Sequence, residues 1–135
     1  MNHEEMTNVK RKEQLKNVVE KYFESFRTKS FDSIPYSEEV VLRAPIVPGG
    51  VHSPLKGKQE LLTKWWQPLE PALEGINIKI IDRFYNDSLT GVIAKADFTL
   101  AGQGITLRVA DMFFVNNEGK IIEQENHFDA SPLRS

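Results

Sequence analysis

The sequence predicts a single α+β domain, and two patterns support this fold class. Apolar residues recur at helical spacing between residues 15 and 26, whereas residues 76–85, 91–100 and 105–115 have the composition of strands. Closely spaced strands with short turns predict an antiparallel meander. Two helical segments precede these strands, so we expect them to cover one face of the sheet.

The N-terminal part of the chain contains a helix and a long loop. Residues 1–10 are polar, and we expect a flexible leader there, before a single domain at 11–135. The run 45–54 contains three prolines and two glycines, which exclude a helix or a central strand, and it is long enough to act as a lid. A short strand is expected at 40–44. The first helix has one apolar stripe that includes a tyrosine: Leu15, Val18, Val19, Tyr22, Phe23 and Phe26.

A second helix is expected after Gly57, and Pro68 and Pro71 should bend or end it. The turn at 116–120 leads into a last strand from residue 121 to about 129. The inner side of the second helix carries five apolar residues: Leu61, Leu62, Trp65, Trp66 and Leu69.

The composition excludes several classes of protein. The 135 residues can bury one core, and a formal charge of −2 provides no basic field for nucleic acid. The chain has no cysteine, which excludes disulfides, thiolate nucleophiles and zinc sites built on sulfur. No apolar run is long enough to span a membrane, so a cytoplasmic protein is expected. The histidines and acidic residues show no recognisable metal spacing, and we expect neither a metal nor another cofactor.

Asp111 interrupts an otherwise apolar strand face. It shares that face with Leu107, Val109 and Phe113, because side chains alternate along a strand. Burying an ionised carboxylate without a partner costs several kcal/mol, so Asp111 should be either hydrogen-bonded and charged or protonated with a raised pKa. Both states are typical of a working pocket. The alternative is a structural aspartate bonded to a loop or a helix end.

Lys95 and Asp97 pose a question of orientation. They share one strand face, and the other face is apolar: Val92, Ala94, Ala96, Phe98 and Leu100. The alternation alone favours an inward apolar face and a solvated charged pair.

Several motifs, in this order, resemble the nuclear-transport-factor-2-like superfamily, which includes SnoaL-like cyclases, ketosteroid isomerase and limonene-epoxide hydrolase. They cover about residues 12–130 and read VVEKY at 18–22, GKQEL at 57–61, FFV at 113–115, EGKII at 118–122 and NHFD at 126–129. The resemblance implies a cystatin-like α+β roll, in which a cone-shaped, curved antiparallel sheet wraps around N-terminal helices. A pocket would open at the wide end. The fold hosts many activities, so it implies no single one.

The resemblance to ketosteroid isomerase also implies roles for three residues. Tyr22 falls where that enzyme has the tyrosine of its oxyanion hole, and Asp111 falls where it has a protonated aspartic acid. The general-base aspartate of that enzyme falls on Ala44, which cannot take a proton.

The resemblance to the epoxide hydrolase concerns a different set of residues. Asp97 matches an aspartate, Lys95 stands for an arginine, and Asn126 stands where a catalytic aspartate would be. On this basis Lys95 and Asp97 lie in the pocket, which contradicts the alternation of the strand. Val92, Ala96 and Phe98 would then form a sheet-to-sheet contact in a homodimer.

The remaining candidates concern the pocket wall and its mouth. We expect Trp65, Trp66 and Phe113 to contact a ligand. His52, on the loop at 45–54, is a candidate proton acceptor at the pocket mouth, and the alternative is an exposed loop histidine.

These observations predict a protein that binds a small apolar ligand. If it is an enzyme, Asp111 and Tyr22 would stabilise an oxyanion in an isomerase, cyclase, dehydratase or hydrolase step. Asp97, His52 or a bound water would supply the base. The alternative is a non-catalytic ligand-binding or dimerisation module that has lost its base.

Overall fold

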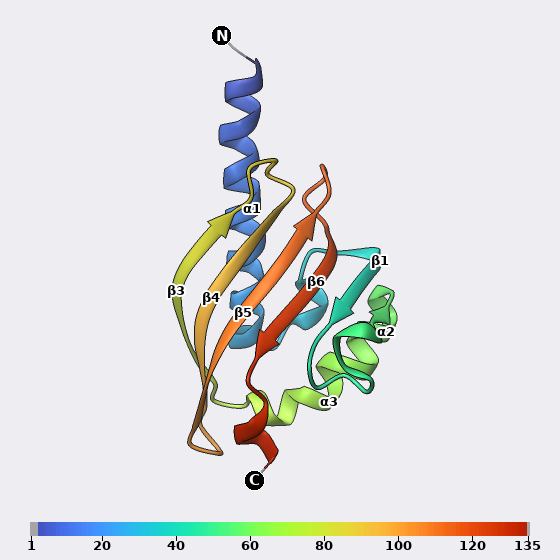
Figure 1. Cartoon of the computed structure of the whole chain (residues 1–135), viewed down its shortest axis with the longest axis vertical. Coiled ribbons are helices and arrows are strands. Elements are labelled where there is room, and N and C mark those ends of the chain that lie inside the picture. The colour runs from blue at the N-terminus through green and yellow to red at the C-terminus, as the bar shows by residue number, and fades with distance from the viewer. Residues whose placement is uncertain (1–2, 135) are drawn as a thin grey trace.

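The computed structural model describes residues 3–134, with side chains from residue 8 to residue 133. A long helix, α1 (His3–Thr28), lies against the inner face of a six-stranded sheet (Figure 1). The helix includes most of the segment expected to be a leader, whose flexibility stays a prediction. No helix in the described part of the chain is long and apolar enough to cross a membrane.

The predicted apolar stripe attaches α1 to the sheet. Just after the helix, Lys29 adopts a left-handed conformation with φ of 59°, a common way for a helix to end. Its Nζ donates to the carbonyl oxygens of Phe26 and Leu73, at 3.1 and 2.8 Å, and so joins the helix end to a distant segment. All six residues of the stripe are buried: Leu15, Val18, Val19, Tyr22, Phe23 and Phe26.

The sheet has the order β2-β1-β6-β5-β4-β3. The four C-terminal strands form the predicted antiparallel meander, and β1 pairs with β6 in parallel. The expected strand at 40–44 begins earlier, at Tyr36. The strands are β1 (Tyr36–Arg43), β2 (Leu55–Lys56), β3 (Asn77–Tyr85), β4 (Gly91–Leu100), β5 (Ile105–Val115) and β6 (Ile121–Phe128).

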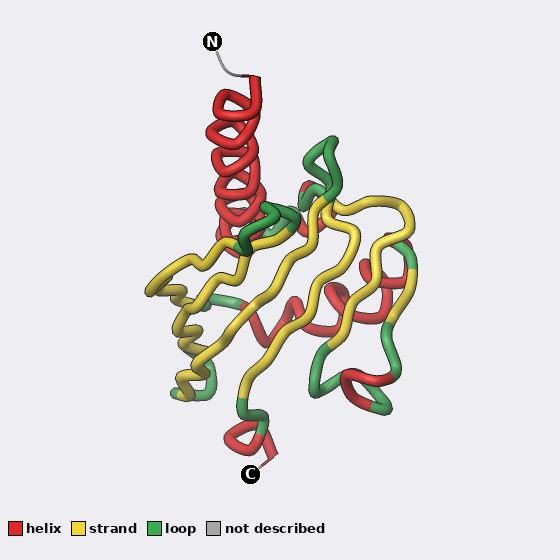
Figure 2. The backbone as a smooth tube through the Cα atoms, turned by 45° about the horizontal axis from the view of Figure 1, so that its top comes forward, coloured by secondary structure: helices red, strands yellow, loops and turns green. Residues whose placement is uncertain are grey.

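Three irregularities accompany the curvature of the sheet. The register shifts between Tyr36 and Val41 in β1, between Ile80 and Asp82 in β3, and between Phe114 and Val115 in β5. An extra residue in one strand bends that strand and increases its twist. The sheet therefore curves and leaves a concave inner face toward α1 (Figure 2).

The second predicted helix is present, but its type changes along the chain. A π-helical turn, Leu62–Trp66, separates α2 (Lys58–Leu61) from α3 (Gln67–Leu69), and a 3-10 turn, Glu70–Leu73, follows. The backbone N–H of Gln67 bonds to the carbonyl oxygen of Leu62, five residues earlier. A π-turn is wider than an α-turn. Adjacent tryptophans, Trp65 and Trp66, are both buried here.

The faces of β4 settle the question of Lys95 and Asp97. Both side chains are on the outer face, where Asp97 accepts a hydrogen bond from Arg108. The placement implied by the resemblance is therefore wrong, and the alternation of the strand was the better guide. Val92, Ala96 and Phe98 cannot form the expected dimer contact for the same reason, because they are buried on the inner face, whereas the homodimer itself stays a prediction.

Candidate functional site

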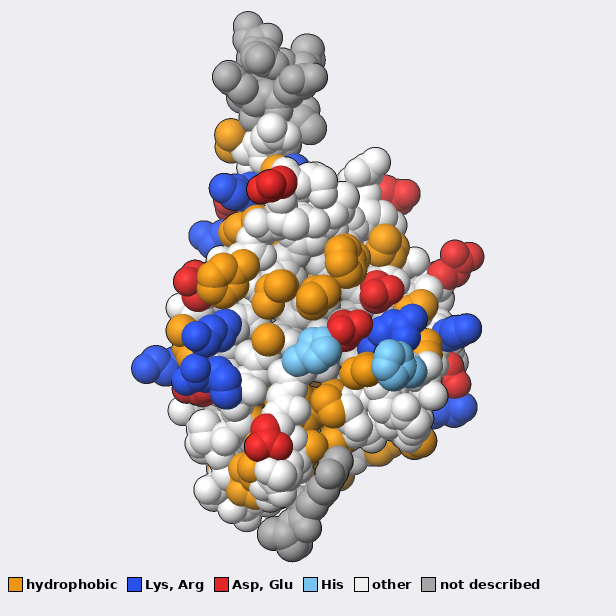
Figure 3. Space-filling model, viewed as in Figure 1, with side chains coloured by type: hydrophobic (Ala, Val, Ile, Leu, Met, Phe, Trp, Pro, Cys, Tyr) orange, Lys and Arg blue, Asp and Glu red, His pale blue; other side chains and the backbone are white. Residues whose placement is uncertain are grey.

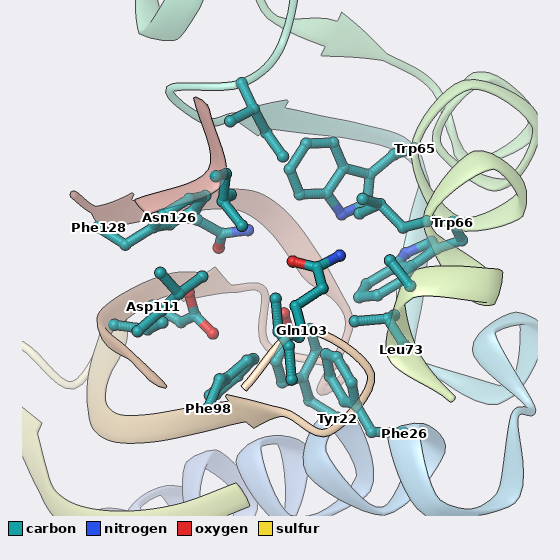
Figure 4. A pocket seen from close by; sticks show the side chains of 17 residues that line it. Tyr22, Phe26, Trp65, Trp66, Leu73, Phe98, Gln103, Asp111, Asn126 and Phe128 are labelled. Atoms are coloured by element: carbon teal, nitrogen blue, oxygen red, sulfur yellow. The ribbon is translucent and has the colours of Figure 1, made fainter. Parts of the chain in front are cut away.

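A pocket lies between α1, the helical run at 58–73 and the inner face of the sheet. It encloses about 120 Å³. Cavities of about 150 Å³ hold a benzene molecule, so a single-ring ligand matches the enclosed space. Figure 4 shows Asp111 and Asn126 on one side and Trp65 and Trp66 on the other. The remaining lining is mainly apolar: Phe26, Ile46, Leu69, Ala72, Leu73, Phe98, Leu100, Leu107, Val109, Phe128 and Leu133.

Strand register brings the polar residues of the pocket together. Asp111 on β5 stands directly opposite Asn126 on β6, and Phe113 stands opposite Gln124. Opposed residues of an antiparallel pair share a face, so Gln124 and Asn126 face inward beside Asp111. Tyr22 of α1 approaches this group from the helix side. The four polar side chains therefore meet where the helix crosses the sheet.

A chain of buried hydrogen bonds leads to Tyr22. The indole N–H of Trp66 donates to the Tyr36 hydroxyl at 3.3 Å, and that hydroxyl donates to Gln124 Oε1 at 2.6 Å. Gln124 Nε2 then donates to the Tyr22 hydroxyl at 3.2 Å and to Asn126 Oδ1 at 3.1 Å. The Tyr22 oxygen thus accepts a bond from the protein, which leaves its proton for Asp111 or for a ligand.

Asp111 is a buried carboxylic acid. Its side chain is 1% exposed, and Oδ1 has no hydrogen-bond partner among the described residues. Burial raises the pKa of Asp111 to about 8, and hydrogen bonding with Tyr22 opposes this rise. At neutral pH the folded protein therefore holds Asp111 mainly in its protonated form, which can donate a hydrogen bond.

Tyr22 is fixed beside this acid. Burial raises the pKa of its phenol well above the ordinary value, and the negative charge of an ionised Asp111 adds to the rise. The ring packs edge-on against Phe113 and Trp66, with centroids 4.8 and 5.9 Å away. Tyr22 therefore stays protonated, and its packing holds the hydroxyl in position.

The structure separates the predicted site residues into two groups. Asp111, Tyr22 and Asn126 line the pocket together with both tryptophans, Trp65 and Trp66.

Four other predicted residues do not line it. Phe113 lies behind the Tyr22 ring and is fully buried. His52 is exposed on a 3-10 turn, and Lys95 and Asp97 are on the outer face of the sheet. The expected pocket contacts of these residues are therefore wrong in this structure, and both side chains considered as bases, Asp97 and His52, lie outside the pocket.

Three polar residues near the site were not predicted. Gln124 shares a strand face with Asn126, so the alternation of β6 carried a usable signal for it. Tyr36 had no such signal, because its role depends on the parallel pairing of β1 with β6. Gln103 lies on the turn between β4 and β5 and lines the pocket, and Figure 4 shows its side chain between Asp111 and Trp66.

The described residues offer no obvious metal site. Among them, no group of three or more His, Asp or Glu side chains lies in an arrangement that could hold a metal ion.

Comparison with known families and structures agrees with this architecture. The sequence profile of the SnoaL-like domain matches residues 19–124. The chain belongs to the SnoaL-like family. It is therefore a member of the nuclear-transport-factor-2-like superfamily, as the motifs predicted. No curated protein sequence matches the chain significantly.

Solved structures share the fold of this SnoaL-like protein at low sequence identity. An NTF2-like protein of unknown function from Cytophaga hutchinsonii is 15% identical, with a TM-score of 0.67 over 90% of this chain and 95% of that one. A steroid delta-isomerase from Pseudomonas aeruginosa is 13% identical, with a TM-score of 0.65 over 86% and 80%.

The epoxide hydrolase/cyclase-like enzyme SalBIII, which acts in pyran ring formation in the polyether salinomycin, is 16% identical. Its TM-score is 0.72 over 90% of this chain and 95% of that one. At these identities the likeness shows the fold alone.

Proposed function

We propose that this SnoaL-like protein binds an uncharged, apolar small molecule through one oxygen atom, to which Asp111 donates a hydrogen bond. The observation that carries this proposal is the buried Oδ1 of Asp111, which has no partner among the described residues and borders an apolar pocket. An unmet buried polar group costs about 1–3 kcal/mol, and a ligand oxygen would recover part of that cost.

The lining of the pocket argues for an uncharged ligand. Among the described side chains that line it, none is basic. A buried carboxylate or phosphate without a cationic partner would be strongly disfavoured. A carbonyl, an ether, an epoxide or a hydroxyl oxygen carries no such cost. The ligand class is therefore a neutral, oxygen-bearing molecule with an apolar body.

If the protein is an enzyme, the site supports an acid-assisted step. A protonated Asp111 with a pKa of about 8 can stabilise or protonate an oxygen that gains negative charge. Neither Asp97 nor His52 faces the pocket to act as a base. An isomerase or cyclase step in which the substrate supplies its own nucleophile fits this arrangement best. Fold similarity to an isomerase and to a cyclase-like enzyme supports the same class.

The second candidate function is non-catalytic ligand binding. It is favoured by the same observation that limits the chemistry, namely that both side chains considered as bases lie outside the pocket. The two functions share the hydrogen bond from Asp111, so one binding experiment tests both.

The experiment compares cyclohexanone with methylcyclohexane, two single-ring probes that differ in their oxygen atom. We expect wild-type protein to prefer the ketone and the Asp111→Leu variant to lose about 1–3 kcal/mol of ketone binding. The Asp111→Asn variant, whose amide can still donate, should keep most of the affinity. Binding is measured by protein NMR titration, and Asp97→Leu on the outer face is the matched control. Equal ketone affinity in wild type and Asp111→Leu would refute the proposal.

A further inference from the structure

The indole N–H of Trp65 is a second buried donor without a partner. The side chain is 7% exposed, and Nε1 has no hydrogen-bond partner among the described residues. Its neighbour behaves differently, because the Trp66 indole donates to the Tyr36 hydroxyl at 3.3 Å. An indole N–H can only donate, and buried tryptophans normally find an acceptor for it. The indole N–H of Trp65 is therefore a buried donor that the described part of the protein leaves without an acceptor.

Trp65 and Asp111 face the same pocket from opposite sides. Both line it, and Figure 4 shows them across the cavity from each other. In the same view the indole nitrogen of Trp65 points toward the interior, on the side of Gln103. Apolar side chains, such as Phe98 and Phe128, occupy other parts of the wall. The pocket thus has one unmet polar group at each end of an apolar space.

We propose that the ligand carries two oxygen acceptors at opposite ends of its apolar body, one bound by Asp111 and the other by the Trp65 indole. This inference rests on the proposed function and narrows its ligand class to dioxygenated molecules such as diketones, hydroxy ketones or lactones with a second oxygen. The two donors fix the orientation of the ligand, because only one end of the pocket holds the acid. Trp65 is therefore a specificity-determining residue, and Asp111 contacts the oxygen that would react.

The π-helical turn explains how Trp65 reaches this position. Trp65 and Trp66 are adjacent, yet both are buried, and their rings meet nearly edge-on with an interplanar angle of 79°. Trp66 stacks on Phe31 at 4.5 Å and joins the internal hydrogen-bond chain. In this wider turn the indole N–H of Trp66 bonds within the core network, whereas the indole N–H of Trp65 is left for the ligand.

The test uses the fact that the chain has only two tryptophans. The two indole N–H signals in a proton–nitrogen NMR spectrum are assigned with Trp65→Phe, which removes one of them. Cyclohexanone and 1,4-cyclohexanedione are then titrated into the wild-type protein. We expect the dione to move the Trp65 indole proton downfield, as a new hydrogen bond does, and to bind more tightly than the monoketone.

The variants locate the second contact. Trp65→Phe should weaken dione binding roughly 3- to 10-fold more than it weakens cyclohexanone binding, because the difference corresponds to one neutral hydrogen bond. Trp66→Phe is the matched control and should not change the ratio of the two affinities. An unchanged ratio in Trp65→Phe would overturn the inference. If that variant does not fold, Trp66→Phe assigns the remaining indole signal to Trp65, and an unmoved Trp65 signal in the wild type overturns the inference instead.

Two further results separate this inference from the proposed function. Loss of cyclohexanone binding in Asp111→Leu, together with no effect of Trp65→Phe on the dione, would leave the proposed function standing and remove the second contact. A Trp65 indole signal that moves in Gln103→Leu without any probe would show that Gln103 is its acceptor, which also overturns the inference. Binding of neither ketone to the wild type would overturn both proposals.

Discussion

Asp97 and Asp111 lie on neighbouring strands of one sheet, yet the pKa values of their carboxyl groups shift in opposite directions. Asp97 on the outer face of β4 stands opposite Arg108 of β5, and the hydrogen bond from this guanidinium lowers the pKa of Asp97. Asp111 on the inner face of β5 is buried, and burial raises its pKa to about 8. The face of the strand therefore decides whether an aspartate here is a solvated anion or a neutral acid.

The largest expected difference between the two faces is the pH dependence of stability. The unfolded chain loses the Asp111 proton near pH 3.8, whereas the folded protein keeps it up to about pH 8. Wild-type stability should therefore fall relative to Asp111→Asn as pH rises through this window, by up to about 1.4 kcal/mol per pH unit. Urea unfolding of both proteins from pH 4 to pH 8 measures this difference.

The outer aspartate provides the control with the opposite sign. The pKa of Asp97 is lowered in the folded protein, so its contribution is present above its unfolded pKa and is lost as pH falls. The wild type should therefore be more stable than Asp97→Asn at neutral pH and should lose this advantage only at low pH. The change with pH should be smaller than the one caused by Asp111. A constant stability difference between Asp111→Asn and wild type from pH 4 to pH 8 would show that Asp111 is ionised when folded.

The buried hydrogen-bond chain gives a smaller effect on the inner face. Tyr36→Phe removes the hydroxyl that accepts from Trp66 and donates to Gln124, so two buried polar groups lose their partner. We expect the free energy of unfolding to fall by about 1–3 kcal/mol in urea titrations at pH 7. Ser37→Ala, at the half-buried neighbour of Tyr36, removes only the acceptor of a solvent-exposed hydrogen bond from the Glu39 backbone and should change it much less. Equal stabilities of Tyr36→Phe and wild type would mean that the chain contributes nothing.

The outer face carries an apolar surface of its own. Its residues stand next to one another on three strands, and Phe84 is 50% exposed. Figure 3 shows apolar side chains gathered in a band across this face, with basic groups over β3 and β4 and both acidic and basic groups toward β6 and β1. We define the outer apolar band as Phe84, Ile93, Met112 and Phe114.

We propose that the outer apolar band forms a homodimer contact. A two-fold arrangement would bring the basic groups over β3 and β4 of one copy, including Lys95, toward the carboxylates on β6 of the other, including Glu125. Met112→Glu should raise the dimer dissociation constant about 10-fold or more, because it places a charge inside the contact. Light scattering across a concentration series measures the effect. A wild-type protein that is monomeric at high micromolar concentration would contradict the proposal.

The sequence was informative wherever one strand or one helix carried the whole signal. The stripe on α1 and the alternation of β5 placed Tyr22 and Asp111 correctly, because periodicity reports local geometry directly. The alternation of β4 also placed Asp97 outside. The resemblance placed it inside, because carrying a role over to one position assumes that the strand presents the same face in both proteins.

The remaining features depend on contacts between distant segments. No local turn connects β1 to β6, so the sequence gives no signal for their parallel pairing. The role of Tyr36 depends on that pairing and was therefore not predictable. The π-helical turn at Leu62–Trp66 also left no clear pattern, although both tryptophans were expected on the inner side of the second helix. These features decide which donors in the pocket are satisfied internally and which are left for a ligand.

The protonation state of Asp111 is the central claim, and a carbon-13 NMR titration of the aspartate carboxyl groups tests it most directly. The Asp111 signal is assigned by its absence in Asp111→Asn, and Asp97 in the same spectra should titrate below the ordinary aspartate value. We predict that the Asp111 carboxyl titrates near pH 8. A midpoint at or below the ordinary value of 3.8 would show an ionised carboxylate, which could not donate a hydrogen bond to a ligand oxygen.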